Sequence, residues 1–260
     1  FRRKKYTCYL GNWSQRIVMF NFLKRKEKPI IEFYCHPNVE GTIPTPRPAS
    51  KHVPDWFKSI PPTMPGRDAR NRKGLTAKKC MPMLDAMTLG YIIPLCGDLG
   101  LKSSEDCNTI EVFNPDELKL AEFHDLNQLG PKAPGMPAPP VKFINHWVIK
   151  TAPGWSTLII PLVNNSLANP HFTCLGGLVD TDTYPKEINF PAVWHTPNFD
   201  GFLPSGTPLV VAIPIKRSSV PRECVTRPMT DKEFKDIDII HRKQCNKLHV
   251  YTDELREKRK

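Results

Sequence analysis

The 260-residue sequence lacks the signatures that would identify a function directly. No stretch approaches the ~20 consecutive apolar residues that a membrane-spanning helix requires, so we expect no membrane partner. The phosphate-binding loop, the Gly-x-Gly-x-x-Gly motif, the Gly-x-Ser-x-Gly motif and the His-Glu-x-x-His motif are all missing. Their absence excludes the commonest enzyme classes that bind nucleotides, hydrolyse esters through serine or cleave peptides with zinc.

Cysteine pairs at metal-site spacing are also missing. The eight cysteines contain no Cys-x-x-Cys motif, and disulfide scaffolds are normally much shorter chains. We therefore expect reduced, mostly buried thiols in an intracellular, cytoplasmic protein. No apolar segment follows the basic N-terminus, so we expect no secretory signal.

Basic residues outnumber acidic residues at the two ends of the chain. The formal net charge is +11, but residues 29–215 are close to neutral, so the excess of lysine and arginine lies outside them. Residues 1–28 form a basic lead that we expect to be disordered, with a natural start at Met19. Charged termini often remain solvated without a function. We therefore expect no nucleic-acid partner for the folded body.

The last part of the chain, residues 218–260, is predicted to be a charged helical extension. Thr230 and Glu233 have the spacing of a capping box, in which each residue satisfies a backbone N–H of the other at the start of a helix. The pattern predicts a helix from there to about His241.

Residues 29–217 are predicted to form one β-rich domain with proline-rich loops. The 28 prolines of the chain are about twice the usual ~5% share, and they favour loops and short strands over long helices. One helical turn is expected at 53–58, and a short helix at 82–89 followed by a strand at 90–96. Apolar runs separated by turn residues predict antiparallel strands over 147–217. The side chains expected to be buried there are Trp147, Leu158, Ile160, Phe172, Leu178, Phe190, Trp194, Leu209, Val211 and Ile213.

Two segments resemble a family of bacterial and tailed-phage proteins classed only as a domain of unknown function. The first runs from Lys79 to Pro94 and contains Cys-Met-Pro-Met, a helical stretch and Gly-Tyr-Ile-Ile-Pro. The second runs from Thr151 to Arg217 and contains Ala-Pro-Gly-Trp, Gly-Leu-Val-Asp-Thr-Asp and Ile-Pro-Ile-Lys-Arg. Tyr91 stands where that family usually has Trp. The resemblance implies a shared fold over about 79–217 and no known activity.

A shorter segment resembles the trimeric dUTPases. Gly177-Leu-Val-Asp-Thr-Asp-Thr-Tyr184 is similar to their Gly-Val-Ile-Asp-x-Asp-Tyr motif, and Gly206-Thr-Pro-Leu-Val-Val is similar to their closing strand. The resemblance implies a β-clip fold, Asp180 as a general base, Tyr184 beside the sugar and Mg²⁺ as a cofactor. The chain departs from the pattern at the inserted Thr183. It also lacks the Arg-Ser-Gly phosphate loop and the glycine-rich C-terminal arm.

Asp180 and Asp182 form the most prominent polar pair of the predicted sheets. In a strand, two residues at this spacing would project to one face, where they could hold Mg²⁺ or act as a base. Alternatively they flank a turn after Val179 and accept backbone N–H groups, which is a common structural use of aspartate. We favour the structural interpretation.

Histidines and aromatic residues supply the other candidate sites. His171 and His195 could belong to a cupin-like metal centre, although they lack the His-x-Asp spacing of such sites. Trp155 and Trp194 are most simply explained as core residues, with a ligand-stacking cleft as the alternative. Together with Arg217 they are the candidate ligand-binding residues.

The fold class that follows is mainly β (α+β), a compact antiparallel domain of β-clip or sandwich type. It carries a short internal helix and a C-terminal helix. The function expected is a non-catalytic binding or interaction module of an intracellular bacterial or phage protein, without a cofactor. Its partner would be a protein or a small molecule, and a homo-oligomer is compatible with the sequence.

Two enzymatic alternatives stay open at this point. The first is a dUTPase-like hydrolase that uses Asp180, which an arginine converging on this residue would favour. The second is a cupin-like mononuclear metal enzyme, which three ligands meeting near His171 or His195 would favour.

Overall fold

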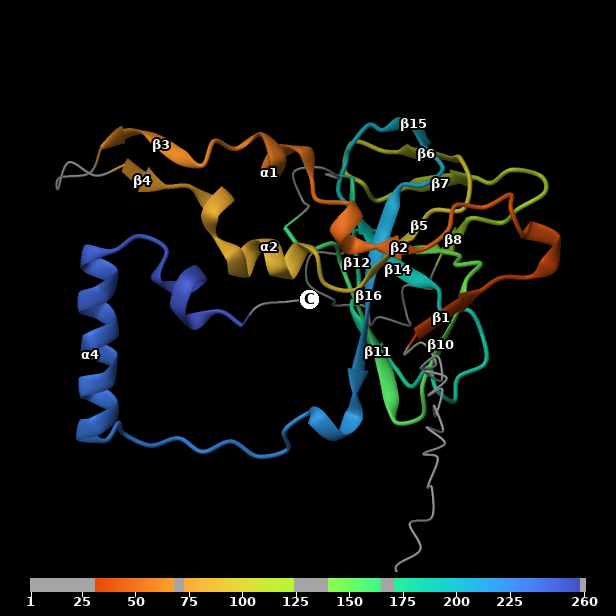
Figure 1. The fold of residues 1–260 in the computed structure, drawn as a ribbon. Coiled ribbons are helices and arrows are strands. Elements are labelled where there is room, and N and C mark those ends of the chain that lie inside the picture. Colours follow the sequence, from red (N-terminus) through yellow and green to blue (C-terminus); the bar gives the residue numbers. More distant parts are fainter. Residues whose placement is uncertain (1–30, 68–72, 124–139, 165–170, 258–260) are drawn as a thin grey trace, which may run out of the picture.

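The computed structural model describes residues 31–67, 73–123, 140–164 and 171–257, and Figure 1 shows their arrangement. The expectations for residues 1–28, including the natural start at Met19, lie outside the described residues. Within the described ranges, no helix combines the length and the apolar composition needed to cross a membrane.

Antiparallel sheets form the body, as the sequence predicts. The largest sheet has the strand order β13-β11-β16-β5-β2. Its strands are β2 (Arg47–Pro48), β5 (Tyr91–Pro94), β11 (Trp155–Ile160), β13 (Gly177–Val179) and β16 (Pro208–Lys216). A four-stranded sheet has the order β12-β14-β9-β8. Its strands are β8 (Ala121–Phe123), β9 (Val141–Phe143), β12 (Phe172–Cys174) and β14 (Phe190–Trp194).

Three smaller sheets complete the strand pairing. One has the order β15-β6-β7, with strands β6 (Leu99–Ser103), β7 (Ile110–Phe113) and β15 (Asp200–Leu203). The two-stranded sheets pair β1 (Ile31–Tyr34) with β10 (Val148–Thr151), and β3 (Thr63–Arg67) with β4 (Lys73–Leu75). Every one of these pairings is antiparallel. Most of the paired strands lie far apart in the sequence, and among these pairs short connections join only β3 to β4 and β6 to β7.

The helices are short, except for one near the C-terminus. The α-helices are α1 (Asp55–Ser59), α2 (Met81–Met87) and α4 (Asp231–Asn246), and η5 (Tyr251–Leu255) is a π-helical turn. The 3₁₀ turns are η1 (Pro37–Val39), η2 (Ala49–Lys51), η3 (Ala77–Lys79) and η4 (Arg217–Ser219). The internal helix and the following strand therefore lie within about two residues of their predicted positions. Phe57, which is 2% exposed, anchors α1 to the body.

Aromatic and aliphatic side chains from several sheets share one core. Its largest fully buried members include Phe143 and Phe190. The rings of Phe143 and Phe172 lie 4.7 Å apart between their centroids. Of the side chains predicted to be buried, six are buried: Trp147, Phe172, Phe190, Trp194, Leu209 and Val211. Leu158, Ile160 and Ile213 are half-buried.

The prediction for Leu178 is wrong, since this side chain is 62% exposed. Leu178 lies opposite Leu158 in the strand pairing, and Leu158 in turn lies opposite Ile213. Cross-strand partners project to the same face, so these three residues share the outer face of the largest sheet. Strand β13 is the edge of that sheet, and the small cluster around Ile92 and Val211 that covers this face does not include Leu178.

The cysteines are divided between the sheets and the helical segments. Cys96, Cys107 and Cys174 are buried, whereas Cys80, Cys224 and Cys245 are exposed. The expectation that most thiols are buried is therefore only partly correct. Burial raises the pKa of the Cys96 thiol to about 11 and that of Cys174 further, which disfavours the reactive thiolate form of both.

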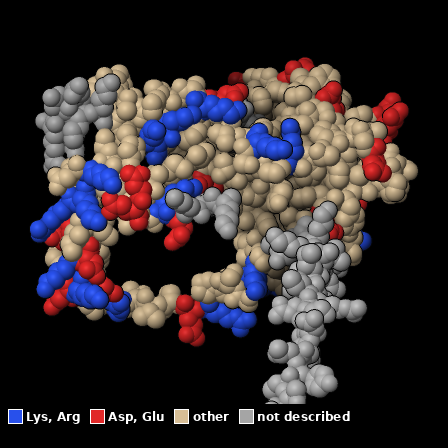
Figure 2. All heavy atoms as spheres, in the orientation of Figure 1, with Lys and Arg blue, Asp and Glu red and all other residues tan. Residues whose placement is uncertain are grey.

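The segment after β16 forms an arm that leaves the body and returns to it. Thr230 and Glu233 make the predicted capping box at the start of α4, and the helix continues to Asn246, beyond the predicted end. The arm returns where Arg256 donates to Asp85 of α2, at 2.7 and 3.0 Å. Figure 1 shows α4 far from the largest sheet and on the same side of the molecule as β3 and β4, and Figure 2 shows the opening that the arm leaves beside the body.

Candidate functional site

The acidic motif of the sequence forms a tight turn directly after β13. The backbone N–H groups of Thr183 and Tyr184 both donate to the Asp180 carbonyl oxygen, at 3.0 and 2.9 Å. Asp180 and Asp182 therefore flank a turn instead of lying in one strand, as the structural interpretation expected. The same-face argument for a metal pair does not apply to them.

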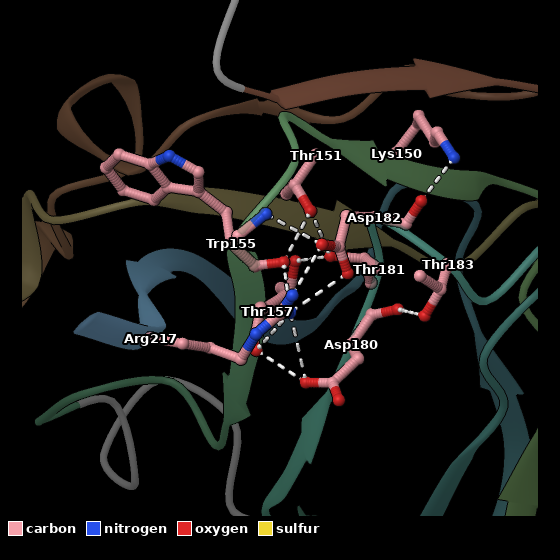
Figure 3. Close-up of polar contacts among 11 residues, drawn as sticks. Lys150, Thr151, Trp155, Thr157, Asp180, Thr181, Asp182, Thr183 and Arg217 are labelled. Carbon is pink, nitrogen blue, oxygen red and sulfur yellow. Dashed lines mark hydrogen bonds and ion pairs between the residues drawn. The ribbon is translucent and has the colours of Figure 1, made fainter.

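Arg217 binds this turn from the end of β16. Its guanidinium makes a two-pronged contact with the Asp182 carboxylate, with N–O distances of 2.9 and 2.6 Å. It also donates to the carbonyl oxygen of Trp155 at 3.0 Å and lies 3.4 Å from Oδ1 of Asp180. Figure 3 shows these groups converging while the Trp155 indole points away from them. The arginine thus joins β11, β16 and the turn.

Asp182 is the most constrained member of the cluster. Its side chain is 7% exposed, and it accepts the Gly154 backbone N–H at 2.8 Å as well as the guanidinium. The Arg217 guanidinium is the main cause, and the Gly154 N–H the second, of a pKa for the Asp182 carboxyl well below its ordinary value. Gly154 has φ +83°, a left-handed conformation that favours glycine at this turn.

Three threonine hydroxyls lie beneath the turn. Thr181 Oγ1 bonds both Thr151 Oγ1, at 2.8 Å, and Thr157 Oγ1, at 2.7 Å. All three residues are at most 4% exposed. Buried hydroxyls are stabilising only when they are paired, and here each one satisfies another. The network links the start of β11 to the turn.

This arrangement provides little for hydrolysis. An arginine converges on Asp180, as the dUTPase-like alternative requires, but its charge is shared between two carboxylates and its Nη1 and Nη2 groups already donate to Asp182 and β11. Asp180 itself is exposed, with 61% of its side-chain surface accessible, and it accepts a hydrogen bond from Ser156 at 2.6 Å. Tyr184 is 41% exposed. The contacts of Asp182 and Arg217 join the acidic turn to β11 and β16.

The histidine candidates make separate local contacts. His171 Nδ1 lies 2.9 Å from Thr196 Oγ1, and His195 Nε2 lies 2.8 Å from Thr173 Oγ1. Throughout the described part of the chain, no group of three or more His, Cys, Asp or Glu side chains is placed to hold a metal ion. The cupin-like alternative therefore gains no support from the surroundings of either histidine.

A cavity of about 510 Å³ lies elsewhere, between the η2–α1 segment and the end of β15. Its volume falls within the ~300–1,000 Å³ typical of small-molecule sites. One wall is charged or polar and the other is largely apolar. The lining residues are Lys51, His52, Val53, Pro54, Asp55, Lys58, His171, Phe202, Leu203, Pro204, Thr207 and Pro208.

Cations outnumber anions around this cavity. Lys51 and Lys58 line it together with one acidic residue, Asp55, which Lys58 contacts at 2.8 Å. Burial is the main cause of a lowered pKa for His52, and the nearby charges of Arg47 and Lys58 lower it further. Figure 2 shows Lys and Arg side chains on the face of the molecule that carries α1.

Neither aromatic candidate of the sequence, Trp155 or Trp194, lines this cavity, and Trp194 approaches it through His171. Trp194 is 4% exposed and belongs to the core, where its ring stacks on His171 at 5.7 Å between centroids. Phe199 contacts both rings, at 5.0 and 5.1 Å. The core therefore holds His171 in place at the cavity wall.

Sequence reasoning missed Lys51, Lys58 and Phe202 as candidate site residues. The two lysines come from a proline-rich stretch and Phe202 from a strand about 150 residues later, and no spacing rule connects them. One signal was available, because the expected helical turn at 53–58 places Lys58 directly after two aromatic residues, Trp56 and Phe57, of which Phe57 is buried. Comparison with known proteins adds no assignment, since no protein-family model matches the chain and no curated protein matches its sequence.

Proposed function

We propose that this chain is a non-catalytic binding module of an intracellular bacterial or phage protein. Its ligand is a small molecule that binds in the cavity between the η2–α1 segment and β15. The observation that carries the proposal is the cavity itself, which combines a ligand-sized volume, an apolar wall and several polar groups that converge on it. Such a combination is the usual property of a small-molecule site.

The state of the acidic turn supports the non-catalytic part of the proposal. A catalytic carboxylate requires partners that change their interactions as the reaction proceeds. Asp182 and Arg217 instead neutralise each other and are held by backbone groups of β11 and the preceding turn. Their role is to fix the ends of three strands.

Mapping by nuclear magnetic resonance tests this proposal. Pools of neutral, cationic and anionic small-molecule fragments are added to the isotopically labelled full chain, and the shifts of the backbone amide signals are followed. We expect the largest shifts at residues that line the cavity, and the same shifts in an Asp180→Asn variant. Shifts that centre on residues 180–184, or that disappear in Asp180→Asn, would contradict the proposal, as would an absence of shifts with every pool.

A further inference from the structure

We infer that the ligand of the cavity carries an aromatic ring and an oxyanion group, either phosphate or carboxylate. This inference rests on the proposed function, because it names the ligand class of the same site. The charged wall and the exposed aromatic residues beside it supply two independent observations.

The charged wall favours an anion. Lys51 and Lys58 are exposed at the cavity, and the carboxylate of Asp55 offsets only one of them. The ion pair between Lys58 and Asp55 is itself exposed, with 58% of the Lys58 side chain and 95% of the Asp55 side chain accessible. Such an exposed ion pair is weak and opens readily. An incoming oxyanion therefore meets two ammonium groups, and Lys binds phosphate and carboxylate groups as a compact point charge.

The apolar wall carries an unusual aromatic feature. Phe202 is 73% exposed, which leaves most of a large apolar side chain in water. Phe202 of β15 pairs with Gly100 of β6. On its other side Gly100 pairs with Phe113 of β7, which is 53% exposed. The two rings thus flank a glycine on one face of the sheet.

Gly100 allows both rings to lie close together. A Cβ atom at this position would meet Phe113 Cβ at 3.0 Å and Phe202 Cε1 at 3.4 Å. The glycine therefore leaves a shallow aromatic surface that continues into the cavity wall through Phe202. A planar ring on that surface would cover exposed apolar area and gain the offset stacking that aromatic pairs prefer.

A single-stranded nucleic acid would use the same chemistry, since such ligands also combine stacking with basic grooves. The dimensions favour the smaller ligand. The cavity volume of about 510 Å³ is that of a small-molecule site, and the body between residues 29 and 215 carries no excess of basic residues.

Four probes separate the contribution of the oxyanion from that of the aromatic ring. Each is titrated into the full chain, and its binding is followed by calorimetry and nuclear magnetic resonance. They are phenyl phosphate, benzoate, phenol and inorganic phosphate. We expect phenyl phosphate or benzoate to shift the signals of cavity residues and to bind at least about fivefold more tightly than phenol or inorganic phosphate, because only they engage both walls. Whichever aromatic anion binds better identifies the preferred oxyanion.

Two variants and their matched controls test the residues. Lys51→Glu should weaken phenyl phosphate binding about tenfold or more, and Phe202→Ala at least about fivefold. Lys186→Glu and Phe234→Ala change exposed residues that do not line the cavity, so they should leave binding unchanged. All four positions are exposed, and unchanged amide spectra confirm that the variants fold.

The outcomes distinguish this inference from the proposed function. Equal binding of phenol and phenyl phosphate in the cavity would overturn the ligand class and leave the binding site standing. No binding of any probe or fragment there would overturn both. A ten-nucleotide oligodeoxythymidine that binds more than about a hundredfold tighter than phenyl phosphate would also overturn the ligand class, in favour of a nucleic-acid strand.

Discussion

Replacing Trp194 by alanine is expected to lower the free energy of unfolding by about 3–5 kcal/mol, the usual cost of removing a large buried aromatic side chain. Trp194 is 4% exposed. Its ring stacks on Phe172 and His171 and makes a T-shaped contact with Phe199. The indole N–H donates to the Thr196 carbonyl oxygen at 2.8 Å, and the substitution also removes this hydrogen bond, although Ser103 Oγ still donates to the same oxygen at 2.7 Å.

Urea unfolding of the two proteins at one pH measures this difference. Phe202→Ala is the matched control, because it removes an aromatic ring that is 73% exposed and should cost less than about 1 kcal/mol. A loss below 1 kcal/mol for Trp194→Ala would show that this ring is not part of the core. A loss for Phe202→Ala as large as that for Trp194→Ala would show that Phe202 is packed, which would remove the aromatic surface from the cavity.

Asp182→Asn is expected to lower the melting temperature at neutral pH, since it removes the negative charge that holds Arg217. Asparagine keeps the size of the side chain and can still accept the Gly154 N–H. It cannot make the charge-assisted, two-pronged contact with the guanidinium. The effect should also exceed that of Asp180→Asn, because 61% of the Asp180 side chain is exposed and only 7% of the Asp182 side chain.

The pH dependence gives this second prediction a definite sign. The folded-state pKa of Asp182 lies below its ordinary value of 3.8. The carboxylate therefore stabilises the fold fully above that ordinary value, and this stabilisation is lost as the pH falls towards the folded-state pKa. The difference in melting temperature between the wild type and Asp182→Asn should be largest at neutral pH and should shrink below about pH 4. A difference that is absent at pH 7, or that grows in acid, would contradict the structural role of Asp182.

The features that the sequence predicted are those set by neighbouring residues. Apolar, β-branched runs predicted β11 and β16 because strand formation depends on local alternation and on the turns at each end. The capping box predicted the start of α4 because both partners lie within four residues. The end of α4 was misplaced by five residues, since no comparable local signal marks it.

The features that were missed depend on contacts between distant parts of the chain. The exposure of Leu178 follows from the position of β13 at a sheet edge, which its own sequence does not reveal. Arg217 was a candidate ligand residue, yet its binding to Asp182 joins residues 35 positions apart. The cavity likewise combines three remote segments, at 51–58, 171 and 202–208.

Incubation of the purified full chain with dUTP and Mg²⁺ tests most directly whether this protein binds without catalysing a reaction. General-base catalysis by Asp180 would supply about 10²–10⁴-fold, whereas enzymes typically reach about 10⁶–10¹⁷-fold. The rest would have to come from groups that clamp the phosphates, and the one arginine at the turn is already engaged by Asp182. We predict no release of pyrophosphate above that of buffer alone. Turnover by the wild type that disappears in a folded Asp180→Asn variant would contradict the account and identify the acidic turn as an active site.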